Sequence, residues 1–202
     1  MILTVYEQFR DIGRDIYLAG LISSHGGNMS VRVGDRMLIT RRGSMLGRLA
    51  ASDIIETALD HDDSEIALAS TEIVVHRAIY HQTNGLAIVH THSPHTILRS
   101  MIDDEIVPVD SEGSYLLHKV PVHSLPQTAG SSDVAETVSS ALRDYKCVVL
   151  RGHGPFAIGT VLEEAFQWIS CLEMASKILN LRDSLGVELK EYREHGEEYG
   201  KW

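Results

Sequence analysis

The sequence predicts a single domain of the mixed α/β class, with strands at its centre and helices outside. Short apolar runs of strand length alternate along the chain with longer segments whose apolar residues recur at helical spacing. Elements in this order typically pack as a sheet covered by helices. The 202 residues suffice to bury a substantial core, and no linker-like or repeated segment divides them. One domain is therefore expected over 1–202, with a C-terminal tail from about 186.

Turn and capping signals set the bounds of the predicted elements. A helix is expected over 4–20, where a glycine ends it, and the Gly34-Asp35 turn joins strands at 31–33 and 36–40 into a hairpin. Ser70, Thr71 and Glu72 begin a helix that continues to about residue 80. The remaining elements are, in order, a strand at 86–90, a helix at 94–101 with an early proline, a partly extended segment at 107–122, a capped helix at 131–144, strands at 147–150 and 156–158, and a long helix at 162–185.

The composition argues against several classes of protein. A formal net charge of −10 disfavours general binding of nucleic acid, which depends on Lys and Arg. The N-terminus has no signal-peptide pattern, and no run of about 18 apolar residues could span a membrane. Cys147 and Cys171 lie in apolar segments without metal-binding spacing, and buried free thiols suit a reducing cytosol. We therefore expect a cytoplasmic protein without a membrane or nucleic-acid partner.

Two histidines end the predicted strand at 86–90. His90 and His92 are separated by one residue, so in an extended strand their side chains project from one face about 6.5 Å apart and can reach one ion. His153 follows another apolar run and lies between glycines, which let the backbone approach a ligand. Three histidines with one open position are typical of a catalytic zinc or a similar divalent ion. The alternative is that they are ordinary members of the 11 histidines in the chain.

Glu72 is the candidate acid and base, because it begins a helix beside Ser70 and Thr71. A partly desolvated carboxylate near a divalent cation can take and return a proton. A solvated carboxylate in that position would only be stabilised by the helix dipole. The same helix N-terminus offers N–H groups to an anion, as do the turns at 26–28 and 40–43. Together with the histidines, these donors indicate a small phosphorylated substrate.

Five short motifs lie along the chain: Gly27-Asn28-Met29-Ser30, Leu38-Ile39-Thr40 with Gly43, Ser70-Thr71-Glu72, His90-Thr91-His92 and Gly152-His153-Gly154. They occur in the order and spacing of the class II aldolase/adducin family, which this chain resembles over roughly 6–179. The resemblance implies a three-layer α/β/α sandwich with a mainly antiparallel central sheet. It also implies a homotetramer with active sites at the subunit interfaces.

The resemblance assigns roles to residues of these motifs by position. His90, His92 and His153 match the metal ligands, with zinc typical of the aldolases and manganese or cobalt as alternatives in relatives. Glu72 matches the catalytic acid/base, which can also coordinate the metal. The positions that hold the substrate phosphate match Asn28, Gly43, Ser70 and Thr71.

The chain departs from the family pattern at three places. Arg42 stands where the aldolases usually carry Thr or Ser, and because arginine can bind phosphate bidentately, we include it in the phosphate-binding set. Glu112 and Tyr115 lie in the segment that in the family supplies a tyrosine to protonate the aldehyde oxygen across the subunit interface. Either is a candidate for that donor. His25 replaces a hydroxyl residue.

The reaction implied by the resemblance is the cleavage of a ketose 1-phosphate to dihydroxyacetone phosphate and an aldehyde, through an enediolate that the metal stabilises as a Lewis acid. Two alternatives stay open. One is an epimerase or dehydratase acting on a related sugar phosphate, and the other is a non-catalytic, adducin-like binding module. The charged and aromatic tail at 188–202 is either a solvated end or a segment whose tyrosines reach over an active site, in this subunit or a neighbouring one.

Overall fold

A single eight-stranded sheet forms the centre of the protein. The structure is a computed structural model, and it describes residues 4–190. The strands lie in the order β3-β2-β1-β4-β8-β7-β6-β5, and β6 pairs with β7 in parallel while every other neighbouring pair is antiparallel. Their bounds are β1 (Asn28–Val33), β2 (Arg36–Thr40), β3 (Ile54–Ala58), β4 (Ala87–His90), β5 (Glu105–Ile106), β6 (Val120–His123), β7 (Cys147–Leu150) and β8 (Gly154–Gly159).

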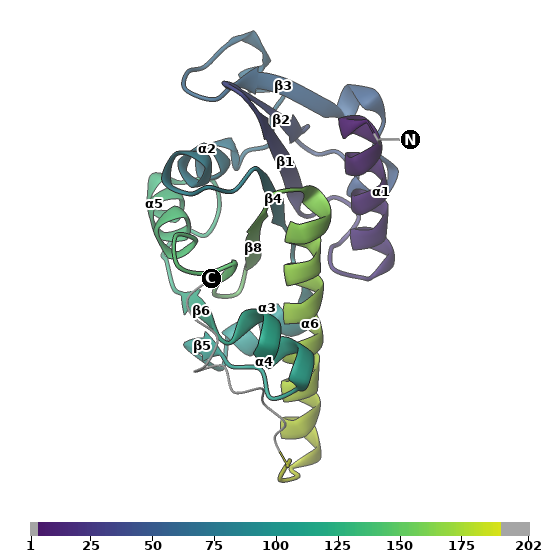
Figure 1. The fold of residues 1–202 in the computed structure, drawn as a ribbon, viewed down its shortest axis with the longest axis vertical. Coiled ribbons are helices and arrows are strands. Elements are labelled where there is room, and N and C mark those ends of the chain that lie inside the picture. Colours follow the sequence, from purple (N-terminus) through teal and green to yellow (C-terminus); the bar gives the residue numbers. More distant parts are fainter. Residues whose placement is uncertain (1–3, 191–202) are drawn as a thin grey trace.

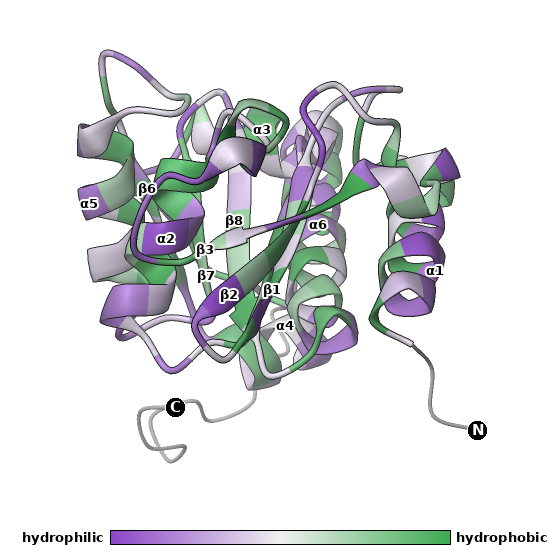
Figure 2. Ribbon diagram, turned by 90° about the horizontal axis from the view of Figure 1, so that it is seen from above, coloured by the Kyte–Doolittle hydropathy of each residue, from purple (hydrophilic) through white to green (hydrophobic). Residues whose placement is uncertain are grey.

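Helices cover both faces of this sheet, which confirms the expected three-layer α/β/α sandwich (Figure 1). Two helices pack on one face, and a long C-terminal helix lies with the N-terminal helix on the other, as the view in Figure 2 also shows. The α-helices are α1 (Val5–Leu18), α2 (Ile73–Gln82), α3 (Pro94–Ser100), α4 (Ser111–Leu117), α5 (Ser132–Ala141) and α6 (Leu162–Leu185), and three short 3₁₀ turns are η1 (Leu46–Arg48), η2 (Ala51–Asp53) and η3 (Ser64–Ala67). Helices α2 and α5 form the first layer, and α1, α4 and α6 belong to the second.

The central strands are apolar on both faces because each face is covered. Side chains alternate across a strand, so Ile88 of β4 packs with the α2/α5 layer, whereas Ala87 and Val89 pack with α6. Strand β7 divides in the same way, since Val148 joins the first layer and Val149 the second. This two-sided burial explains why the strands appear in the sequence as continuous apolar runs.

Capping residues set the helix ends where the sequence predicted them. Thr4 and Glu7 form a capping box at the start of α1, in which the Glu7 N–H donates to Thr4 Oγ1 at 3.2 Å. Ser131 accepts the N–H of Val134 at 3.2 Å and begins α5. Gly186 ends α6 with a φ of 62°, a left-handed conformation that favours glycine. Both bounds of α6 agree with the prediction.

The segment at 107–122 is extended in part, as expected, because it ends in β6, but it also contains α4, which the sequence analysis did not assign. Asp110 caps this helix by accepting the Gly113 N–H at 2.8 Å, and Gly113 gives the sequence a poor helix signal. A Cβ on Gly113 would lie 3.2 Å from Cβ of Ala175 in α6, so α4 packs closely on that helix. Tertiary packing therefore outweighs local propensity here. Strand β3, which the sequence analysis did not assign, extends the hairpin at its outer edge.

Three further expectations concern the cysteines, membrane-spanning helices and the C-terminal tail. Cys147 and Cys171 are free and buried, as predicted. None of the helices within residues 4–190 combines the length and apolar character that a membrane span requires. Of the tail at 188–202, which was expected either to be solvated or to reach over an active site, residues 188–190 are exposed, and the rest, including Tyr192 and Tyr199, lie outside the described residues.

Candidate functional site

Three histidines meet at one end of the central strands. His90 is the last residue of β4, where it pairs with Asn28 of β1 and with Phe156 of β8. His153 lies in the turn between β7 and β8, at the same end of the sheet. The ring centroids of His90, His92 and His153 are 4.8 to 5.1 Å apart, and one potential ligand atom from each lies within 4.8 Å of the others. The structure thus brings together the three histidines that the sequence singled out.

Two glycines allow the loops to approach the strand end that carries these histidines. Gly154 has a φ of 148°, and a Cβ on it would lie 2.1 Å from the carbonyl oxygen of Thr91. Gly27 has a φ of 76°, and its Cβ would lie 2.7 Å from the carbonyl oxygen of His90. A side chain at either position would push the backbone away from the site. This close approach explains why glycine occupies these positions in the two motifs.

The histidine rings are held neutral and oriented toward a common point. His90 Nδ1 donates a hydrogen bond to the Pro155 carbonyl at 2.9 Å, which leaves the lone pair on Nε2 for another partner. Burial, together with the proximity of His153 and His92, holds the pKa of His90 well below its usual range. Burial also lowers the pKa of His92, and it lowers the pKa of His153 to about 4. Neutral imidazoles are the form that coordinates metals.

Glu72 faces these rings from the start of α2. Its Oε2 lies 3.4 Å from His90 Nε2 and accepts a hydrogen bond from Asn28 Nδ2 at 2.9 Å, while Oε1 lies 3.9 Å from His153 Nε2. The side chain is buried, which raises the pKa of Glu72 to about 7, and the bond from Asn28 partly offsets that rise. An acid/base group works best when its pKa lies near the operating pH. The structure therefore places a suitable proton carrier directly beside the histidines.

The donor set fits a divalent cation. His90 Nε2 and Glu72 Oε1 are buried and lack a hydrogen-bond partner within the described part of the chain. Native proteins rarely leave such atoms unsatisfied, and each one calls for an explanation. A cation bound among three neutral imidazoles would provide it, with Glu72 adjacent as a fourth ligand or as a base. This arrangement of three histidines and an open side is the one associated with catalytic sites.

A cavity of about 210 Å³ opens beside the histidines and contains the other predicted binding residues. Ser70 is buried at the start of α2, whereas Thr71, Arg42 and Gly43 are exposed at the cavity. Arg41, which the sequence analysis did not single out, also lines it, but its guanidinium is bound to Asp53 Oδ1 at 2.6 Å. The cavity lining comprises His25, Gly26, Gly27, Asn28, Arg41, Arg42, Gly43, Ser44, Ser70, Thr71, Glu72, His92, Ala129 and His153.

Glu112 and Tyr115 do not belong to this cavity within one subunit. Both lie on α4 and are exposed. Glu112 lines a different cavity, together with Cys171 and Met174 of α6. A role for either residue at the histidine cluster would therefore require a second copy of the chain.

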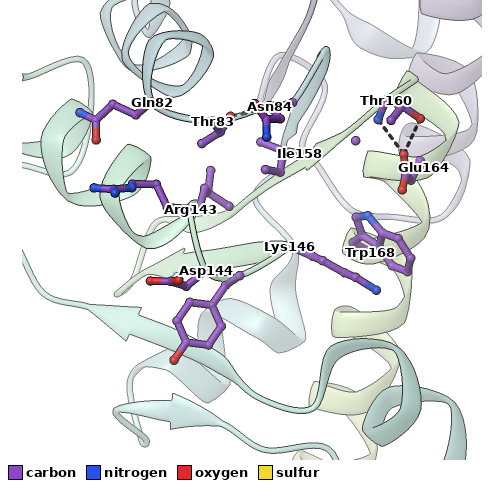
Figure 3. A pocket seen from close by; sticks show the side chains of 14 residues that line it. Gln82, Thr83, Asn84, Arg143, Asp144, Lys146, Ile158, Thr160, Glu164 and Trp168 are labelled. Carbon is purple, nitrogen blue, oxygen red and sulfur yellow. Dashed lines mark hydrogen bonds between the residues drawn. The ribbon is translucent and has the colours of Figure 1, made fainter. Parts of the chain in front are cut away.

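A third cavity lies at the opposite end of the sheet (Figure 3). It has a volume of about 400 Å³ and is lined where β4 begins and β8 ends, by residues such as Gly85 and Gly159. Lys146 reaches over the ring of Trp168 at 3.9 Å, and Glu164 accepts the Thr160 hydroxyl at 2.7 Å. None of the residues predicted to be functional lines this cavity.

His76 is a functional candidate that the sequence analysis missed. It is fully buried on α2, and its Nε2 lies 2.6 Å from Asn28 Oδ1, so it contacts the site from behind. The spacing offered a signal, because residues 72, 76 and 80 recur every four positions and therefore share one helix face. Ser30 and Tyr80 complete this buried polar group.

The burial of His76 should make the stability of the metal-free protein depend on pH. Burial lowers the pKa of His76 to about 3, from a usual value near 6.5. Between these values the unfolded chain binds a proton that the folded protein does not, so the stabilisation is complete above pH 6.5 and is lost as the pH falls toward 3. We expect His76 to contribute a slope of about 1.4 kcal/mol per pH unit to the free energy of unfolding.

Urea unfolding of the wild type and of His76→Gln at pH 7.5, 6 and 5 measures this slope. Glutamine does not titrate, so the difference in unfolding free energy between the two proteins should shrink as the pH is lowered. A difference that stays constant over this range contradicts the expectation.

Comparisons of the sequence and of the structure with known proteins agree on one family. A family profile described as "Class II Aldolase and Adducin N-terminal domain" matches residues 7–179. An L-fuculose phosphate aldolase of Methanocaldococcus jannaschii is 35% identical over 178 residues, which cover 87% of this chain and 96% of the relative. The L-fuculose phosphate aldolase of Escherichia coli K12 is 31% identical over 169 residues, which cover 81% of this chain and 76% of the relative. The crystal structure of L-fuculose-1-phosphate aldolase from Thermus thermophilus matches with a TM-score of 0.86 at 35% identity, over 92% of this chain and 97% of that one.

Proposed function

This chain belongs to the class II aldolase and adducin family, and we propose that it is an aldolase that uses a divalent cation to cleave a ketose 1-phosphate. The products would be dihydroxyacetone phosphate and an aldehyde, and the substrate would resemble L-fuculose 1-phosphate. One observation carries the proposal: buried Glu72 presents an unpartnered oxygen to three neutral histidines at the edge of a donor-lined cavity, among the residues that the structure describes. The names of the relatives support the class of substrate.

The cavity residues would bind and orient the substrate. Ser70 and Thr71 precede α2, where backbone N–H groups at the helix start favour a phosphate. Gly43 has a φ of 68°, which turns the loop at 40–43 beside the cavity, and the exposed Arg42 adds a positive charge. The oxygen and one N–H of the Asn28 amide already bind protein groups, so only its second N–H is left to donate to the phosphate.

Proton transfer is assigned to Glu72. A cation held by His90, His92 and His153, with zinc as the first candidate and manganese or cobalt as alternatives, would supply Lewis-acid stabilisation of negative charge on the substrate oxygens. When the bond between C3 and C4 breaks, its electron pair stays on the C3 fragment. Glu72 would then deliver a proton to that carbon, because its Oε1 has no other partner among the described residues.

The hydroxyl proton on C4 must leave as the aldehyde forms. In the reverse, bond-forming direction the group that takes this proton would donate it to the aldehyde oxygen, so the predicted donor is an acceptor in cleavage. Glu112 and Tyr115 remain the proposed candidates, and each would act from a neighbouring subunit of a homotetramer, since neither lines the cavity of its own chain. The cytoplasmic location is likewise proposed on the composition of the chain.

Product analysis of a panel of sugar phosphates tests the proposed function. L-fuculose 1-phosphate and its stereoisomers are incubated with the protein and zinc, manganese or cobalt, and dihydroxyacetone phosphate is detected by a coupled assay. We expect equimolar dihydroxyacetone phosphate and aldehyde from at least one ketose 1-phosphate. A C4 epimer without free aldehyde would indicate the epimerase alternative, and loss of water would indicate a dehydratase. No turnover with any substrate and metal would favour the adducin-like binding module.

A further inference from the structure

A buried row of hydrogen bonds leads from Glu72 into the interface between α2 and the sheet. Asn28 Nδ2 donates to Glu72 Oε2 at 2.9 Å, and Asn28 Oδ1 lies 2.6 Å from His76 Nε2. His76 Nδ1 lies 2.6 Å from Ser30 Oγ, which in turn lies 2.7 Å from the Tyr80 hydroxyl. All five side chains are at most 7% exposed. We call these five residues the Glu72 network.

The network exists because a helix and a strand carry matched spacings. Glu72, His76 and Tyr80 recur every four residues on α2, a rise of about 6 Å for each step. Asn28 and Ser30 alternate on β1, where two residues rise by about 6.7 Å. These near-equal steps let the side chains of the two elements interleave, each helix residue bonding to a strand residue.

Each hydrogen bond of the Glu72 network runs in the same sense, with the donor on the side of Tyr80 and the acceptor on the side of Glu72. The ionised carboxylate of Glu72 only accepts hydrogen bonds, and with a proton on Oε1 it still accepts at Oε2, so Asn28 presents its N–H to Glu72 and its oxygen to His76. His76 must then donate from Nε2. Because burial lowers the pKa of His76 to about 3, its ring is neutral and Nδ1 accepts the Ser30 hydroxyl. Ser30 Oγ in turn accepts the hydroxyl of Tyr80.

We propose that His76, Ser30 and Tyr80 are positioning residues that fix the Asn28 amide, so that Glu72 Oε2 is held by Asn28 and Oε1 is the oxygen that exchanges the proton. The two carboxylate oxygens differ accordingly, since Oε2 accepts a hydrogen bond and the buried Oε1 has no partner within the described residues. Without the donor on His76, the amide could rotate and turn its oxygen toward the carboxylate. This inference rests on the proposed function of Glu72.

Substitutions at position 76 separate positioning from packing. Phenylalanine fills the site but removes the donor, whereas glutamine can donate to Asn28 and accept from Ser30. We expect His76→Phe to lower kcat for cleavage by roughly 10- to 100-fold, with KM and metal content close to the wild type. His76→Gln should keep most of the wild-type kcat. Equal kcat values for the two variants would show that His76 only fills space and would overturn the proposal.

Nitrogen NMR of the histidine rings tests the direction of the bonds without substrate. In protein labelled with ¹⁵N-histidine, the His76 ring, assigned by its absence from His76→Gln, should show a protonated Nε2 and an unprotonated Nδ1. Ser30→Ala removes the donor to Nδ1 and should shift that signal, which serves also if His76→Phe does not fold. A proton on Nδ1 in the wild type would overturn the network.

The two measurements also distinguish failure of this inference from failure of the proposed function. If the wild type cleaves no sugar phosphate, the proposed function fails, and with it the catalytic part of the inference, whatever the NMR result. If the wild type is active but His76 carries its proton on Nδ1, the inference alone fails.

Discussion

Replacement of Glu72 by glutamine is expected to lower the rate of cleavage by roughly 10²- to 10⁴-fold, the usual contribution of a general acid or base. Glutamine has nearly the same shape and can still accept the N–H of Asn28, so the fold and the network should persist. It cannot carry the proton, however. In the structure, Glu72 is the buried carboxylate beside the three histidines, and burial raises its pKa to about 7.

Steady-state kinetics of Glu72→Gln with the best ketose 1-phosphate measure this effect, together with metal content and thermal stability. Glu136→Gln is a matched control, because Glu136 is exposed on α5 and lies outside the cavity. The control should keep wild-type kcat. A decrease in kcat of less than tenfold in Glu72→Gln, with a normal metal content, would show that Glu72 is not the general acid or base.

Removal of one of the three proposed histidine ligands is expected to abolish both metal binding and activity. His92→Ala leaves two imidazoles, which cannot retain a catalytic divalent ion in the way that three do. We expect its metal content after dialysis to fall from about one ion per chain to well below a tenth. Activity should fall with it, because the Lewis acid is lost. Chelation of the wild type should have the same effect.

Elemental analysis and reconstitution measure these outcomes. Zinc added back to the chelated wild type should restore cleavage, whereas zinc added to His92→Ala should not. His61→Ala serves as the control, since His61 is exposed and lies outside the histidine cluster. Equal metal content in His92→Ala and the wild type would refute the proposed metal site, and cleavage that survives chelation would refute a metal-dependent mechanism.

Much of the fold followed from local patterns. Helix α6 begins and ends at the predicted residues, because apolar residues recur along it and Gly186 ends it. The strand that carries His90 and the turn that carries His153 were predicted from apolar runs bounded by turn residues. Helix α4 was not predicted, since Gly113 weakens its signal and its stability comes from packing on α6. Strand β3 went unassigned, although it pairs with β2 over five residues.

The sequence by itself determined the type of most elements, the three histidines at strand ends, and the glycines and hydroxyl residues of the cavity. Each of these leaves a mark within a few neighbouring residues, through periodicity, capping or turn chemistry. Only the tertiary structure decided the protonation and partners of the site. Asn28 and Glu72 bond across 44 positions of sequence, and His90 and Pro155 across 65.

Burial and hydrogen bonding are properties of the assembled layers, and they depend on segments that local patterns cannot relate. Packing of α2 against β1 buries Glu72 and keeps the buried His76 ring neutral. It also leaves Oε1 of Glu72 without a partner among the described residues. It is also the three-dimensional arrangement that separates Glu112 and Tyr115 from the cavity of their own chain. The sequence thus determined which residues are available for chemistry, and the fold decided which of their atoms can perform it.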